Sequence, residues 1–213
     1  KPDLVTDGVN VFSPIATANN AYDIYSGTSM SSPAAAGSFL LLQEYYSRLH
    51  GGAFMRLATL RGIAIHTARE AGSNPGPDYQ FGWGLLNMEA AAAVITPNNT
   101  THLIQENVLN NGGTFSLTVI ASGNGTLKAT ICWTDPKGSV TPEGSALDNT
   151  SKKLVNDFDL VIKKGASTYR TWTLNGSLPA NAATRGNNSS DNVEKVELPD
   201  VVPGDTYTIE ITH

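Results

Sequence analysis

The sequence predicts a mixed α/β region followed by an all-β sandwich, and two observations support this division. Residues before about position 96 carry apolar side chains at helical spacing, whereas later residues form short runs of alternating apolar and polar side chains. The change occurs at Thr96–Thr100, a polar stretch that contains Pro97. We therefore expect two domains, covering residues 1–96 and 97–213.

Three helices are expected in the first region, at residues 31–49, 54–69 and 88–94. Pro33 then falls in the first turn of the first helix, where a missing N–H is tolerated. Residues Ala34–Leu42 are apolar or small on all faces, so this helix is expected to be buried all round. The region lacks a βαβ series that could build a covering parallel sheet. We therefore expect it to be the incomplete C-terminal part of a larger α/β domain.

The second region contains short β-like runs separated by clusters of Gly, Asn, Pro and Ser. This spacing is typical of an antiparallel sandwich or jelly roll. Long polar stretches at 136–153 and 175–192 predict loops. The expected strands lie near residues 102–107, 114–120, 126–134, 157–163, 168–172, 193–198 and 206–212.

Composition argues against several classes of partner. The net charge of −5 and the lack of a basic run speak against nucleic acid. No apolar run approaches the roughly 20 residues that a membrane span needs. The single cysteine, Cys132, has no internal disulfide partner and is expected to be a buried apolar thiol. The chain begins at Lys1 without a signal peptide, so we expect a portion of a longer product.

The most informative segment is Gly27–Pro33, with the sequence GTSMSSP. It predicts a loop that delivers Ser29 to a helix N-terminus. Backbone N–H groups point outward there and the helix dipole favours negative charge, so an oxyanion beside Ser29 would be stabilised. We expect Ser29 to be the nucleophile and its N–H an oxyanion donor. The alternative is that Thr28 or Ser29 is a simple N-cap.

GTSMSSP followed by a helix of small residues resembles the nucleophile segment of the subtilisin-like serine peptidases. Three flanking segments match that family in order: Lys1–Val5 its K-P-D strand, Gly8–Val11 its G-V-x-I/V segment, and Tyr79–Asn87 its closing Y-G-x-G-x-x-N segment. One departure is local, because residues 6 and 7 are Thr-Asp where the family usually has Ala-Pro. The resemblance implies hydrolysis of peptide bonds in a polypeptide substrate through an acyl-enzyme.

The same resemblance implies that most of the catalytic groups lie elsewhere. In the family, the catalytic Asp and His lie upstream of the nucleophile in D-T/S-G and H-G-T-H segments, and an upstream Asn completes the oxyanion hole. These two segments are not found in this sequence, so the upstream part of the peptidase domain is an expected partner. We expect no histidine of this chain to serve Ser29 as base. The four histidines are His50, His66, His102 and His213.

Segments Cys132–Pro136, Leu154–Leu160 and Asp191–Val196 resemble the β-domain that follows the catalytic domain in some secreted subtilisin-like peptidases. In those relatives the domain is a jelly-roll-like barrel that packs against the catalytic domain and can bind calcium. No organic cofactor is expected.

The candidate calcium ligands are Asp135, Asp157 and Asp159. Residues 157 and 159 project from one face of a strand, where two carboxylates repel unless they are solvated or bridged by a cation. Asp135 could complete an oxygen cage. The alternative is that these carboxylates are solvent-facing charges or accept hydrogen bonds from loop N–H groups.

Three functions remain open at this point. The first is a portion of a secreted serine endopeptidase, and the second is a binding or adhesion module built on the jelly roll. The third is an inactive homologue. An exposed aromatic face would favour the second, and Trp133 and Trp172 are the only tryptophans after residue 97. The intact GTSMSSP segment favours the first, because a chain that used only the jelly roll gives no physical reason for it.

Overall fold

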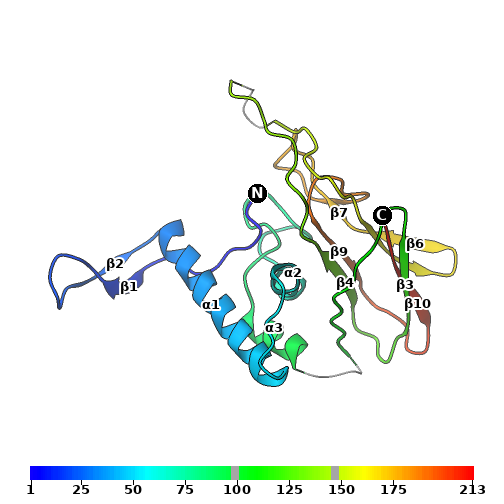
Figure 1. Cartoon of the computed structure of the whole chain (residues 1–213), viewed down its shortest axis with the longest axis horizontal. Coiled ribbons are helices and arrows are strands. Elements are labelled where there is room, and N and C mark those ends of the chain that lie inside the picture. The colour runs from blue at the N-terminus through cyan, green and yellow to red at the C-terminus, as the bar shows by residue number, and fades with distance from the viewer. Residues whose placement is uncertain (97–100, 145–148) are drawn as a thin grey trace.

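The computed structural model describes residues 1–96, 101–144 and 149–213. Within these ranges it has a mixed α and β architecture of helices and several small antiparallel sheets. The helices lie on one side of the molecule and most strands on the other (Figure 1). The predicted domain boundary falls on residues 97–100, which lie outside the described residues, so it stays a prediction.

Helix α1 spans Thr28–Leu49 and begins three residues earlier than predicted. Pro33 is therefore the sixth helical residue and not part of the first turn. Because proline has no N–H, it cannot donate to the carbonyl of Ser29 as another residue would. The expectation that this helix is buried all round is wrong for this chain: Leu42 is buried, but Leu40 and Leu41 are 72% and 64% exposed.

Helices α2 (Leu57–Thr67) and α3 (Met88–Ile95) lie within a few residues of their predicted positions. The Asn87 side chain caps α3 by accepting a hydrogen bond from the N–H of Ala90. None of the described helices is long and apolar enough to cross a membrane. One apolar cluster holds the three helices together, through Leu42, Met55, Ile63, Ala91 and Ile95.

The second region contains eight described strands in antiparallel sheets. One sheet has the order β3-β10-β5-β6, and two smaller sheets pair β4 with β9 and β7 with β8. All the predicted strands except 102–107 overlap an observed one, and β8 was not predicted. The bounds are β3 Thr114–Ile120, β4 Leu127–Cys132, β5 Asp159–Lys164, β6 Ser167–Arg170, β7 Trp172–Thr173, β8 Thr184–Arg185, β9 Val193–Leu198 and β10 Thr206–Thr212.

The strand predicted at 102–107 is wrong, because this segment packs along the helices and joins no sheet. Ile104 contacts the helical cluster. The carboxylate of Glu106 accepts hydrogen bonds from the N–H of Arg56 and the hydroxyl of Thr59, at the start of α2. An acidic group at a helix N-terminus is favourable, so this residue stabilises α2.

The four-stranded sheet and the β4-β9 sheet pack against each other through a shared core. Its buried members include Leu160, Ile162, Val196 and Tyr207. The described strands form no closed barrel, and the jelly-roll topology stays a prediction.

The two regions also share a core at what we call the seam, the contact of α2 and Trp83 with β4 and β9. One apolar cluster there joins Ile65, Ala68 and Trp83 of the first region to Trp172 and Val193 of the second. Figure 1 shows α2 lying beside β4. The second region is therefore packed directly against the helices.

Strands β1 (Val11–Pro14) and β2 (Tyr22–Tyr25) form an isolated hairpin that projects beyond α1 (Figure 1). Phe12 stacks on Tyr22 with a ring separation of 5.2 Å, yet both side chains are exposed. A two-stranded hairpin is marginally stable on its own. Its aromatic side chains lack a covering layer among the described residues.

Candidate active site around Ser29

A glycine N-cap places Ser29 at the start of α1. Gly27 caps the helix through its carbonyl, which accepts hydrogen bonds from the N–H groups of Met30 (3.0 Å) and Ser31 (3.2 Å). Its φ of +154° is a conformation that side-chain-bearing residues rarely adopt. Ser29 is thus the second helical residue, and the alternative of a Thr28 or Ser29 N-cap is wrong.

The loop before Ser29 is held against the segment at residues 6–8. The N–H of Gly27 donates to the carbonyl of Gly8 at 2.8 Å, and the Ser31 hydroxyl donates to the carbonyl of Thr6 at 3.0 Å. A Cβ at Gly8 would lie 2.7 Å from the Gly27 carbonyl oxygen, so only glycine permits this approach. The loop is therefore fixed on both sides of Ser29.

Ser29 itself is exposed, and no hydrogen bond of its hydroxyl is found among the described residues. The N–H groups of Thr28 and Ser29 likewise have no acceptor in the described parts of the chain, as expected for the first turn of a helix. Free N–H groups at the positive end of a helix dipole can stabilise an anion. The arrangement offers a hydroxyl beside oxyanion donors.

Three of the four histidines have partners away from Ser29. His50 follows the end of α1, about 30 Å along the helix from Ser29 at 1.5 Å per residue, and it stacks on Tyr46. His213 packs against Phe158 in the second region. His102 is exposed in the segment that follows the helices.

His66 is held at the seam, where its Nδ1 lies 2.9 Å from the Thr130 hydroxyl. Burial, followed by the positive charges of Lys195 and Lys128, lowers the pKa of His66 to about 4. The ring is therefore neutral at physiological pH, but its Nδ1 is already hydrogen-bonded to Thr130 of β4.

One edge of the segment at residues 3–6 is paired, and the other is open at Leu4. The N–H and carbonyl of Val5 bond to Gly84 and Leu86, at 3.0 and 2.9 Å. The backbone groups of Leu4 point to the other edge, because they alternate along an extended chain, and no partner for them is found in the described residues. A cavity of about 350 Å³ adjoins this segment and is lined by Leu4, Phe39, Leu57, Leu60, Ala64 and Leu86 among others.

The three predicted calcium ligands are not brought together as a set. Both carboxylate oxygens of Asp135 accept N–H groups, from Val155 at 2.6 Å and from the backbone and side chain of Asn156 at 2.9 Å each. Desolvation alone would raise the pKa of Asp135, but these hydrogen bonds lower it. This is the loop-anchoring role considered as the alternative.

Asp157 is paired with Lys152 at 2.6 Å, while its Oδ1 is buried without a partner. No group of three or more His, Cys, Asp or Glu side chains within residues 1–96, 101–144 and 149–213 is arranged to hold a metal ion. Calcium at the set that includes Asp159 therefore does not fit this geometry.

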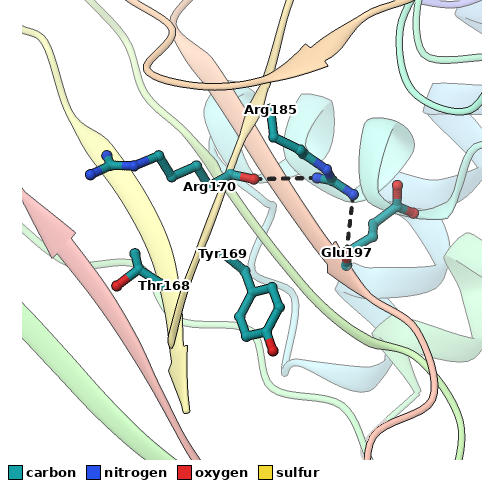
Figure 2. A pocket seen from close by; sticks show the side chains of 5 residues that line it. All are labelled: Thr168, Tyr169, Arg170, Arg185 and Glu197. Atoms are coloured by element: carbon teal, nitrogen blue, oxygen red, sulfur yellow. Dashed lines mark hydrogen bonds between the residues drawn. The ribbon is translucent and has the colours of Figure 1, made fainter. Parts of the chain in front are cut away.

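A second, smaller cavity of about 200 Å³ lies on the β-region and is lined by Thr168, Tyr169, Arg170, Arg185 and Glu197 (Figure 2). The Arg185 guanidinium donates to the carbonyls of Arg170 and Glu197, at 3.3 and 3.0 Å. It also covers the ring of Trp172 at 3.5 Å. Its hydrogen bonds are thus largely internal, and the cavity holds no convergent set of free donors.

Sequence reasoning missed three residues at the core of the second region and the seam. Glu194 and Lys195 in β9 are 0% and 4% exposed, and Arg61 joins the two regions. The alternating run Val193–Leu198 predicted a half-exposed strand, so its charges gave no sign of burial. The only available signal for Arg61 was a charge inside an otherwise apolar helical pattern.

The described part of the first region is mixed α and β structure that presents Ser29 at the start of α1. The model of the subtilase family matches residues 1–84, and this part of the chain is a portion of a subtilisin-like peptidase. The predicted resemblance is confirmed there, and the match does not extend into the β-region. No curated protein matches the chain.

Proposed function

We propose that the chain is the nucleophile-bearing portion of a secreted serine endopeptidase, in which Ser29 attacks the substrate carbonyl and forms an acyl-enzyme. The single observation that carries this proposal is the placement of an exposed serine at the second position of α1, beside N–H groups without acceptors. The Ser29 N–H is one oxyanion donor. A negative charge developing there is stabilised by donors that need no rearrangement.

The base and the remaining donors come from the upstream part of the peptidase domain. Serine is a poor nucleophile unless a base accepts its proton, and His50, His66 and His213 are engaged elsewhere. Upstream sequence supplies the Asp, the His and the oxyanion Asn.

Two features of the first region support docking of that upstream part. The open backbone edge at Leu4 has the geometry to pair with an added strand. The exposed apolar face of α1, with Leu40 and Leu41, needs a covering layer. A sheet that paired with the edge and packed on α1 would satisfy both.

A fluorophosphonate probe tests this proposal. It should label the parent protein at Ser29, as located by peptide mass spectrometry, and should fail to label this chain alone. The Ser29→Ala variant of the parent should lose labelling, while Ser32→Ala, at an exposed position in the same turn, should retain it. Efficient labelling of the isolated chain would contradict the proposal that the base lies elsewhere.

The alternatives make different predictions. The two tryptophans that would have formed an aromatic binding face, Trp133 and Trp172, are 8% and 9% exposed, so no observation favours a binding module. An inactive homologue would have an upstream coding sequence without D-T/S-G and H-G-T-H segments. Reading that sequence decides between an enzyme and an inactive relative.

A further inference from the structure

The segment at residues 1–8 connects the seam to the nucleophile loop. Its start lies beside the seam, and its end, at Thr6 and Gly8, holds Ser31 and Gly27 by hydrogen bonds. Between them, the N–H and the carbonyl of Val5 form hydrogen bonds with residues 84 and 86. A displacement at residue 3 is therefore transmitted along a short stretch of hydrogen-bonded backbone to the loop that carries Ser29.

Arg61 of α2 binds both regions at once. Its Nε donates to Oδ2 of Asp3 at 2.9 Å, and its Nη1 donates to Oδ1 of Asn192 at 2.5 Å. The same nitrogen lies 3.8 Å from the sulfur of Cys132. The planar guanidinium fixes the angle between its two contacts, so it sets the position of Asp3 relative to the second region.

The second region holds Asn192 firmly in turn. The side-chain amide of Asn192 donates to the carbonyl of Trp133 at 2.7 Å, and the backbone carbonyl of Asn192 accepts the N–H of Trp133 at 3.2 Å. Lys1 adds a weaker link, since its Nζ lies 3.6 Å from Asp3 and 3.7 Å from Asp191. The anchor is thus part of the β-region's own hydrogen-bond framework.

The charge on Asp3 is kept by this arrangement. Burial alone would raise the pKa of Asp3, but the hydrogen bond and charge of Arg61, together with Lys1, lower it. The contact between Asp3 and Arg61 therefore joins two charged groups at neutral pH.

We propose that Arg61 is a positioning residue that fixes the nucleophile segment to the β-region, through Asp3 on one side and Asn192 on the other. The β-region then determines the geometry of Ser29 without touching substrate. This inference rests on the proposed function of Ser29 for its catalytic consequence, but the mechanical coupling is independent of it.

Amide hydrogen exchange on this 213-residue chain tests the coupling directly. Arg61→Met should speed exchange in peptides covering residues 4–8 and 27–31. The matched control is Thr130→Val, which removes a hydrogen bond between the same helix and the same sheet but has no contact with residues 1–8. Exchange that rises equally in both variants, or in neither, would overturn the proposal.

Kinetics of the parent protein test the catalytic consequence. Misplacing a catalytic group by about 1 Å can cost up to roughly a hundredfold in rate, so Arg61→Met should lower kcat between tenfold and a hundredfold with KM within twofold. Arg61→Lys, which keeps the charge beside Asp3, should recover part of kcat, and Thr130→Val should leave it unchanged.

A kcat loss that simply follows melting temperature across the variants would overturn the positioning role. A parent that no fluorophosphonate labels would instead refute the proposed function, and the exchange result would still decide the coupling.

Discussion

Helix α1 and strand β9 reverse the usual relation between hydrophobicity and burial. The centre of α1 is an apolar run, yet Leu40 and Leu41 are largely exposed. Strand β9 has the sequence VEKVEL, yet Glu194 and Lys195 are buried. The difference teaches that burial depends on the layers available to an element as well as on its own side chains.

Strand β9 is buried because layers lie on both of its faces. Glu194 points toward β5, where Oε2 accepts the N–H of Leu160 at 2.6 Å. Lys195 points to the seam, where its Nζ lies 3.1 Å from Glu197 and donates to the carbonyl of Ile65 at 3.4 Å. Each of these two side chains has at least one polar partner, while Oε1 of Glu194 is buried without one. Helix α1 has such a layer on one side only.

The largest expected effect concerns Glu194. Burial, followed by the nearby charges of Asp159 and Asp157, raises its pKa to about 8, above the value of an unfolded chain. The folded state therefore holds a proton that the unfolded state releases, and stability should fall as pH rises from about 4.5 to 8. The loss should reach roughly 4 kcal/mol.

Urea unfolding of this chain at several pH values measures this loss. Glu194→Gln should flatten the profile between about pH 4.5 and 8, because it keeps the hydrogen-bond acceptor without the charge. Glu89→Gln, at an exposed position in α3, is the control and should leave the slope unchanged. A profile that is equally steep with glutamine at 194 would show that this carboxyl is not buried as an acid.

A smaller effect of opposite sign is expected from His66 at the seam. Its lowered pKa, about 4, means that the unfolded state binds a proton more readily than the folded state. Stability from this group is present above about pH 6.5 and is lost as pH falls toward 4. After allowance for partial exposure we expect roughly 2 kcal/mol. The acid limb should flatten in His66→Gln, and an unchanged acid limb would contradict burial of this ring at the seam.

The sequence predicted local structure well where the determinants are local. The alternation in residues 114–120 and 206–212 and the helical spacing in residues 54–69 are each readable within a few residues. Predictions failed where a distant partner decides. Segment 102–107 follows the helices because Glu106 meets the start of α2, and Asp135 anchors a loop at Asn156.

The exposure of α1 and the contacts of Arg61 could not be predicted for the same reason. The apolar pattern of α1 indicates a buried helix, but it does not say which chain segment covers it. Arg61 bonds to residues 58 positions before it and 131 after it. Pairings at such separations depend on how whole regions pack, which no local pattern encodes.

The smallest expected effect concerns the exposed apolar face of α1. Replacing Leu40 and Leu41 together by serine should change the stability of this chain by only about 0.5 kcal/mol, because both side chains are already in water. Leu42→Ala, one position further at a buried site, is the matched contrast and should cost about 3 kcal/mol. In the parent protein the double substitution to serine should also lower the free energy of unfolding, since the upstream layer would cover this face. If the double substitution leaves the stability of the parent protein unchanged, α1 is exposed in the whole protein as well. The contrast with β9 is then a property of the fold and does not depend on an upstream layer.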